Sequence, residues 1–161
     1  MKSITAIALC MTLSFSAWSG EMDKHKALLI YKFTEYIVWP DTPDKITVGV
    51  LGDSPIYDEL VRFAARKENL EVIKLTSTKD ADQCQLVYLS KAQGGLMKPL
   101  FASLYQTSVL LVSEDKSHIQ KGANAVVYES EGKLSYIMNE QSIKIKGMTP
   151  SRRLASLAQS F

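Results

Sequence analysis

The sequence predicts a single-domain α/β fold, a three-layer sandwich in which helices cover both faces of a mostly parallel sheet. Short apolar runs alternate with amphipathic segments between residues 46 and 112, a pattern typical of parallel strands joined by helices. Two later apolar runs are separated only by residues 129–133, which predicts an antiparallel hairpin at one edge of the sheet. Apolar helical stripes occur at both ends of the domain, and we expect these N- and C-terminal helices to pack together.

Residues 1–19 have the composition of a signal peptide. Lys2 gives a positive start, and an apolar segment of about 14 residues follows it. Ala17 and Ser19 are small residues at the two positions that determine cleavage. The apolar segment is shorter than the roughly 20 residues of a membrane span, so an uncleaved anchor is the less favoured alternative. We expect cleavage near Ser19 and an exported domain of residues 20–161 that does not insert into the membrane.

The charge and cysteine content of this domain excludes several classes of function. The chain has 19 basic and 17 acidic residues, and only Lys2 lies in the signal peptide, so the domain has a net charge near zero. It therefore lacks the basic field of a nucleic-acid-binding protein. Cys84 is the domain's single cysteine, which rules out an intramolecular disulfide. Its thiol is either packed as a small apolar group or, if exposed, free to form an intermolecular bond.

The first helix is predicted from residues 25–40. Its apolar residues fall within an arc of roughly 120°, wide enough to face a core. Pro40 lacks an N–H group and disfavours a helical conformation for Trp39, so the helix is expected to end at this pair. The residues of the stripe are Leu29, Ile30, Phe33, Tyr36 and Ile37.

The middle of the chain contains four apolar runs that predict strands. Ser54 is expected to cap the helix that follows the first strand, with Pro55 at its first position. A second helix is expected over residues 96–105, after Gly94 and Gly95. The runs without polar alternation suit strands that are covered on both faces. The predicted strands are Ile46–Leu51, Leu70–Leu75, Leu86–Leu89 and Val109–Val112.

The end of the chain predicts the hairpin and a last helix. Ala125–Tyr128 and Leu134–Met138 are the two strands of the hairpin. Thr149 is expected to cap the last helix and Pro150 to be its first residue. The expected apolar face of this helix contains Leu154, Leu157, Ala158 and Phe161.

The sequence contains no strong catalytic, cofactor-binding or metal-binding motif. Residues 49–54 resemble half of a phosphate-binding turn but lack the full glycine spacing. Ser90 and Lys91 precede a glycine pair that could bind an anion, but a loop between strand and helix is the favoured explanation. His25 and His118 are not in a ligand-spaced cluster, and no GxSxG motif supports a Ser-His-Asp arrangement. We predict that the protein is not an enzyme and holds no cofactor or metal.

Four segments, in order, resemble the motifs of the YfiR-like family of periplasmic proteins. They are Phe33–Pro40, Val48–Asp53, Cys84–Ser90 and an ending that includes Ile137–Asn139, Gly147, Ser151, Leu154, Leu157 and Ala158. The resemblance covers nearly the whole exported domain. Cys84 falls on a cysteine position of the family, but its possible partners are missing here.

This resemblance implies a periplasmic α/β regulator, often a homodimer. Such a regulator binds the periplasmic domain of an inner-membrane diguanylate cyclase or related sensor and represses it, which lowers cyclic-di-GMP signalling and biofilm formation. The alternative is a small-ligand binding module that feeds a membrane sensor, with its ligand in the crevice at the carboxyl ends of the parallel strands.

Four residues are predicted to bind the partner, because their types are enriched at interface centres. They are Tyr31, Trp39, Arg152 and Arg153. Core packing is the favoured alternative for Trp39, and a solvated helix face is the favoured alternative for the two arginines.

Overall fold

The computed structural model describes residues 14–159 and contains a six-stranded central sheet. Its strand order is β3-β2-β4-β5-β6-β7, in which all pairs are parallel except β6 with β7. The predicted mostly parallel sheet and its antiparallel edge hairpin are therefore confirmed. The strands are β2 Ile46–Leu51, β3 Leu70–Leu75, β4 Leu86–Leu89, β5 Leu110–Ser113, β6 Ala125–Ser130 and β7 Lys133–Met138.

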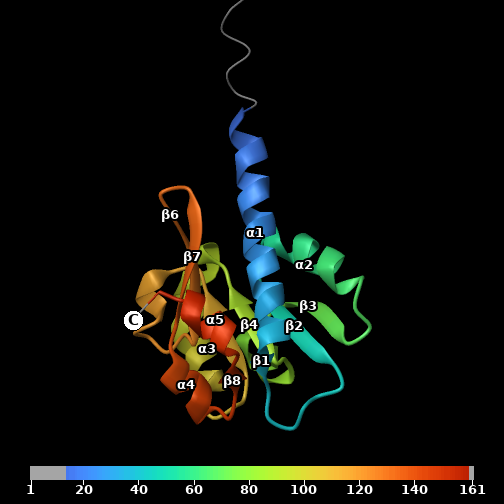
Figure 1. Ribbon diagram of the computed structural model, residues 1–161, viewed down its shortest axis with the longest axis vertical. Coiled ribbons are helices and arrows are strands. Elements are labelled where there is room, and N and C mark those ends of the chain that lie inside the picture. Colours follow the sequence, from blue (N-terminus) through green and yellow to red (C-terminus); the bar gives the residue numbers. More distant parts are fainter. Residues whose placement is uncertain (1–13, 160–161) are drawn as a thin grey trace, which may run out of the picture.

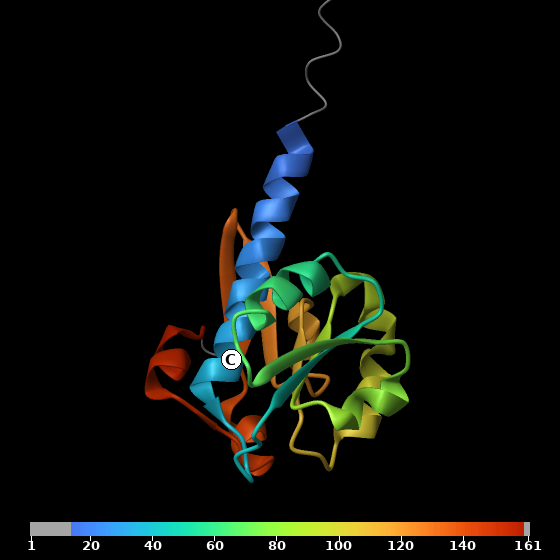
Figure 2. The same cartoon turned by 90° about the vertical axis from the view of Figure 1, so that its right-hand side faces the viewer.

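Helices cover both faces of this sheet, as Figures 1 and 2 show. One hydrophobic cluster joins one face of the sheet to α1, α2, α4 and α5, and a second joins the other face to α3 and η1. No helix in the described part of the chain is long and apolar enough to span a membrane. The helices are α1 Ser14–Tyr36, α2 Ile56–Ala64, α3 Met97–Leu104, α4 Glu140–Ile145 and α5 Arg152–Leu157, with 3-10 helices η1 Thr78–Gln83, η2 Lys91–Leu96 and η3 Lys116–His118.

The first helix ends earlier than the sequence predicted. Ile37 and Val38 leave α1 and form a short strand, β1, which pairs with Thr149–Pro150, the strand β8. Both residues are β-branched and favour an extended backbone, and β8 supplies the pairing that a helical turn would otherwise provide. The prediction that the helix continues to Trp39 was therefore wrong, although the chain does turn after Pro40.

The last helix begins later than the sequence predicted. Thr149 and Pro150 belong to β8, and Ser151 is the N-cap, because its side chain accepts a hydrogen bond of 3.2 Å from the Leu154 N–H. Proline at 150 fits the extended strand as well as it would fit a first helical turn. Of the expected apolar face, Leu154 is buried but Leu157 is 67% exposed. Phe161 lies outside the described residues.

The two ends of the domain meet at this small sheet. Ser151 donates its backbone N–H to the Tyr36 carbonyl at 2.7 Å, which joins the start of α5 to the end of α1. Leu154 of α5 also belongs to the hydrophobic cluster that contains Ile30 and Phe33 of α1. The terminal helices thus share one core, and the β1–β8 pair fixes their adjacent ends.

The predicted cap of α2 is also corrected. Pro55 occupies the N-cap position, and no side-chain hydrogen bond caps the helix. Ser54 takes part through its backbone instead, since its carbonyl accepts a hydrogen bond of 3.1 Å from the Tyr57 N–H. A left-handed residue, Gly52 at φ +75°, precedes this turn, so the residues that resembled a phosphate-binding loop form a tight connection from β2 to α2.

Candidate functional site: the two ends of the sheet

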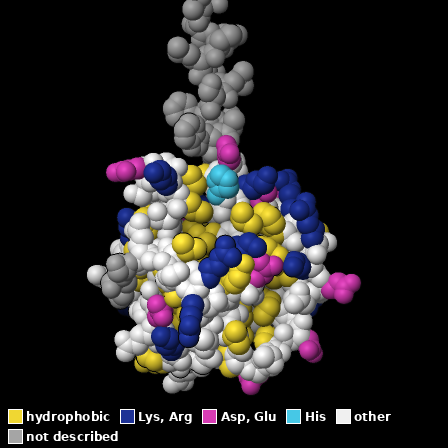
Figure 3. All heavy atoms as spheres, viewed as in Figure 1, with side chains coloured by type: hydrophobic (Ala, Val, Ile, Leu, Met, Phe, Trp, Pro, Cys, Tyr) yellow, Lys and Arg dark blue, Asp and Glu magenta, His cyan; other side chains and the backbone are white. Residues whose placement is uncertain are grey.

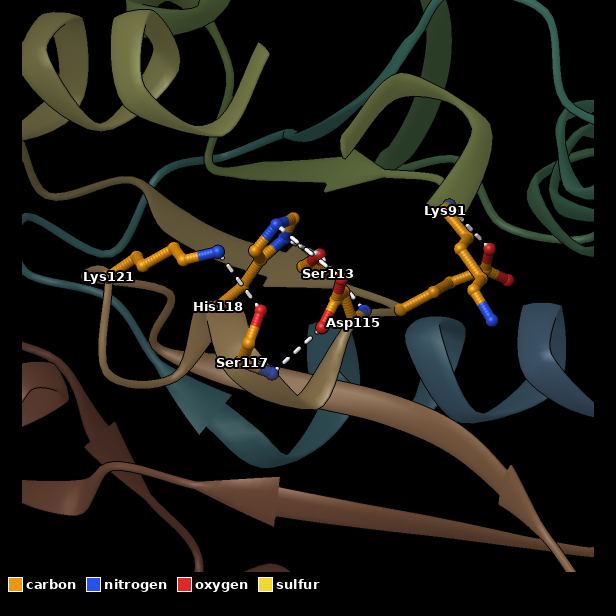
Figure 4. A network of polar contacts seen from close by, with 7 residues as sticks. Lys91, Ser113, Asp115, Ser117, His118 and Lys121 are labelled. Carbon is orange, nitrogen blue, oxygen red and sulfur yellow. Dashed lines mark hydrogen bonds and ion pairs between the residues drawn. The ribbon is translucent and has the colours of Figure 1, made fainter. Parts of the chain in front are cut away.

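The carboxyl ends of β4 and β5 carry a dense network of polar side chains (Figure 4). The chain leaves β2 toward β3 on one side and then crosses to β4 on the other. Open α/β sheets commonly bind ligands where the strand order reverses in this way. The polar groups at this end are therefore a candidate functional site.

Glu114, immediately after β5, joins α1 to two loops. Its Oε1 accepts a hydrogen bond of 2.8 Å from Lys26 Nζ on α1, and its Oε2 accepts one of 2.7 Å from the backbone N–H of Lys91. Burial disfavours the carboxylate, but these hydrogen bonds outweigh it and lower the pKa of Glu114. Both carboxylate oxygens are thus engaged within the protein.

Ser113, Asp115 and His118 lie close together but do not form a catalytic triad. Ser113 Oγ is 2.7 Å from His118 Nδ1, whereas His118 Nε2 is 3.9 Å from the Asp115 carboxylate. Ser113 is fully buried, so no substrate reaches its hydroxyl. Burial also lowers the pKa of His118 and so favours its neutral form. These contacts hold the loop after β5 in place.

A cavity of about 490 Å³ opens beside this network. Its lining contains three lysines and three carboxylates, so it offers no excess of either charge. Lys116 lies 3.8 Å from the centre of the Tyr128 ring, and Lys26 is already paired with Glu114. Within residues 14–159, no group of three His, Cys, Asp or Glu side chains could hold a metal ion.

Two of the predicted partner-binding residues lie in the core. Tyr31 is 8% exposed and stacks on Phe63, with the ring centroids 5.5 Å apart. Trp39 is 5% exposed, and its Nε1–H donates a hydrogen bond of 3.0 Å to the Gln85 carbonyl. Burial gives both residues a packing role and removes most of their surface from contact with a partner.

The other two predicted residues, Arg152 and Arg153, are exposed at the start of α5. Neither forms an ion pair with any side chain in the described part of the chain. Val38, 60% exposed, and Leu157, 67% exposed, lie on the neighbouring β1 and on α5. We call these four residues the terminal surface, because they surround the junction of β1, β8 and α5.

The sequence did not reveal a charged cluster on the outer side of α1. Glu35 forms ion pairs with Lys32 at 2.7 Å and Lys67 at 3.3 Å. The hydrogen bonds from Lys32 and Tyr31 lower the pKa of Glu35 to about 2. Figure 3 shows this face, where apolar side chains are interspersed with Lys and Arg side chains. Ion pairs at i, i+3 such as Lys32–Glu35 are recognisable in a sequence, but the contribution of Lys67 depends on the fold.

The sequence also did not predict a groove of about 550 Å³ at the amino end of the sheet. It lies between the C-terminal end of α3 and α4, and Tyr105, Ile145 and Lys146 are among its lining residues. Tyr105 is 65% exposed and Ile145 78% exposed. Ile145 lies outside the predicted apolar stripes. An apolar residue outside these stripes was the one indication in the sequence of an exposed apolar side chain at this groove.

Cys84 is buried with a free thiol. Burial raises the pKa of its thiol to about 11, which disfavours the reactive thiolate. Gly49 of the neighbouring β2 makes room for it, since a Cβ at that position would lie 2.7 Å from Cys84 Sγ. The thiol is therefore packed as a small apolar group.

Comparison with family models matches residues 23–159 to the family described as DUF4154, YfiR/HmsC-like. The chain belongs to the YfiR/HmsC-like family. Proteins of this family are periplasmic regulators of cyclic-di-GMP signalling, and their role is regulatory rather than catalytic. The comparison with curated proteins finds no match.

Two solved structures with a similar fold are more distant. A conserved domain protein from Vibrio cholerae has 14% identity and a TM-score of 0.64, over 86% of this chain and 59% of that one. An ABC domain from Streptococcus pneumonia, described as a complex with L-Trp, has 11% identity and a TM-score of 0.56, over 81% of this chain and 58% of that one. The YfiR/HmsC-like chain thus spans less than two thirds of either structure, and these similarities concern the fold.

Proposed function

We propose that this protein is a periplasmic regulator that binds and represses an inner-membrane diguanylate cyclase, lowering cyclic-di-GMP signalling and biofilm formation. The observation that carries the proposal is membership of the YfiR/HmsC-like family over residues 23–159. The carboxyl-end network agrees with it, because Ser113 is buried and both oxygens of Glu114 are bonded within the protein, to the Lys26 side chain and the Lys91 N–H.

The terminal surface supplies the chemistry for a protein partner. Arg152 and Arg153 have no internal carboxylate partner within residues 14–159, and Leu157 adds exposed apolar area. Arginine is enriched at interface centres because its planar guanidinium forms paired hydrogen bonds with carboxylates. We place the contact with the cyclase on this surface, against an acidic patch of its periplasmic domain.

Deletion of the gene tests the function itself. Intracellular cyclic-di-GMP is expected to rise in the deletion strain, because the cyclase is no longer repressed, and to return to its original level on complementation. An unchanged level in the deletion strain would reject repression.

Charge reversal tests where the contact lies. Arg152→Glu with Arg153→Glu is expected to weaken binding to the periplasmic domain of the cyclase by at least about tenfold. The free energy of unfolding should change by less than about 0.5 kcal/mol, because both side chains are exposed. Lys79→Glu with Lys98→Glu is the matched control, since it alters the total charge equally at exposed positions near α3. Equal affinities for the two double variants would place the contact elsewhere.

The second candidate function is a small-ligand module that feeds a membrane sensor. The cavity of about 490 Å³ at the carboxyl ends of the strands favours it, because that volume suits a small molecule. In this case deletion of the gene leaves basal cyclic-di-GMP unchanged, and only the response to the ligand is lost.

A further inference from the structure

The groove at the amino end of the sheet has apolar walls, whereas the carboxyl end is a network of polar side chains. Phe101 and Tyr105 of the α3 region pack edge to face along one side, with their ring centroids 5.5 Å apart, and Ile145 of α4 lines the other. Gly122, at φ +105°, makes room for Phe101, because a Cβ there would lie 2.2 Å from the ring. The apolar wall is therefore a property of the fold and not of one mobile side chain.

The floor of the groove is polar, and its Asn124 and Ser142 side chains are bonded to each other. Asn124 is 1% exposed; its Nδ2–H donates to Ser142 Oγ at 2.9 Å, and its Oδ1 accepts from the Leu111 N–H at 2.8 Å. These contacts hold β5, β6 and α4 in register around the groove. They leave a single charged group, Lys146, among the lining residues.

Lys146 is half-buried and its charge is not compensated. Its Nζ donates to the carbonyls of Leu104 at 2.9 Å and Val109 at 3.0 Å. An ammonium group has three N–H donors, so these bonds leave one donor unused. No carboxylate within residues 14–159 lies within ion-pair distance of Lys146, and no acidic side chain lines the groove.

Capping of α3 explains part of this arrangement but not all of it. Leu104 is the last residue of α3. A lysine that bonds to the last carbonyls of a helix interacts favourably with the helix dipole. The same carbonyl already accepts from the Thr107 N–H at 3.2 Å and from Thr107 Oγ1 at 3.0 Å. A cap also does not require the neighbouring Tyr105 and Ile145, which are more exposed than most large apolar side chains of the chain.

We propose that the groove between α3 and α4 binds a small carboxylate with an apolar body, whose carboxylate bonds to Lys146 and whose body lies between Tyr105 and Ile145. One cation with one unused donor suits a singly charged carboxylate better than a phosphate, which would need more donors. A volume of about 550 Å³ suits a small molecule. The site is separate from the terminal surface and independent of the proposed function.

The charge of Lys146 also defines what the site rejects. An ammonium group beside the ligand's carboxylate would approach the lysine and repel it, so simple carboxylates are favoured over amino acids. The probes are therefore phenylpropionate, phenylpropanol, which replaces the carboxylate with a hydroxyl, and phenylalanine, which adds the ammonium group.

The experiment titrates the purified protein with each probe and follows backbone amide resonances by two-dimensional NMR. Phenylpropionate is expected to bind saturably, with shifts concentrated in α3, α4 and the loop before Val109. Phenylpropanol and phenylalanine are each expected to bind at least about tenfold more weakly, the value of one charge-assisted hydrogen bond. No saturable binding of phenylpropionate, or tighter binding of phenylalanine, would overturn the proposal.

Variants separate this site from non-specific binding. Ile145→Ser and Lys146→Met are expected to weaken phenylpropionate binding by at least about fivefold and tenfold. Leu157→Ser is the matched control, because Leu157 is 67% exposed on α5 and lies outside the groove. Ile145 is itself 78% exposed, so Ile145→Ser keeps the fold and tests the site even if Lys146→Met is unstable. Equal losses in Ile145→Ser and Leu157→Ser would show an adventitious apolar contact and overturn the proposal.

Discussion

The two ends of the parallel sheet differ in whether a partly buried charge has a counter-charge. At the carboxyl end, Lys26 and Glu114 neutralise each other at 2.8 Å, and the second carboxylate oxygen binds the Lys91 N–H. At the amino end, Lys146 meets only backbone carbonyls. The carboxyl end has many polar groups that bond to one another, whereas the groove at the amino end is lined by a single charged residue, Lys146, with an unused donor.

This difference shows that a concentration of polar side chains can serve to hold loops together. In many open α/β folds the carboxyl end holds the ligand. Here Lys26 brings α1 over that end, and Ser113 and His118 bond to each other beneath the surface. The bonds there stabilise the loops, whereas Arg152 and Arg153 of the terminal surface and Lys146 in the groove have no carboxylate partner within residues 14–159.

The largest effect is expected from Glu114→Gln. The substitution leaves Lys26, whose side chain is 17% exposed, with only the more distant Asp23 carboxylate at 3.9 Å as a counter-charge, and it weakens the bond to the Lys91 N–H. Removing one member of a partly buried pair should lower the free energy of unfolding by about 2 kcal/mol, measured by urea denaturation at neutral pH. Glu129→Gln is the control, because Glu129 is exposed on β6.

A double-mutant cycle sharpens this prediction. Lys26→Met combined with Glu114→Gln should cost less than the sum of the two single changes, because neither member of the 2.8 Å pair is then left without the other. Additive costs would show that the ion pair does not couple α1 to the carboxyl end, and the contrast between the two ends would then fail.

The sequence predicted the sheet because each strand is a local apolar run, and Leu70–Leu75 and Leu86–Leu89 have the predicted bounds. It did not predict β1 and β8, which have two residues each and exist only because Ile37 meets Pro150 across the chain. Core packing of Trp39 was one of the two interpretations that the sequence allowed, but its hydrogen bond to the Gln85 carbonyl joins residues that are distant in sequence. The sequence did not predict the groove either, because Lys146 and Leu104 are distant in sequence and are brought together only by the fold.

A smaller effect is expected when His118 is removed. Burial lowers the pKa of His118 from its ordinary value of 6.5, so as the pH falls below 6.5 the unfolded chain takes up a proton before the folded one. The free energy of unfolding of the wild type should therefore decrease in this range. His118→Gln should cost about 1 kcal/mol at pH 8 by losing the bond to Ser113, and its stability should depend less on pH below 6.5. Curves that remain parallel would contradict a buried neutral His118.

The smallest effect at neutral pH is expected from Lys146→Met. The loss of two hydrogen bonds is offset by removal of a half-buried charge, so the free energy of unfolding should change by about 0.5 kcal/mol.

The same variant tests the pH dependence of stability, because burial lowers the pKa of Lys146 from 10.5 to about 8. Between these values the unfolded chain still holds the proton that the folded chain has lost, so the free energy of unfolding of the wild type should rise with pH above 8 relative to the variant. Phenylpropionate bound at the groove would stabilise the ammonium and reduce that rise. If wild type and variant show the same pH dependence from 8 to 10, Lys146 is not the uncompensated cation that distinguishes this end of the sheet.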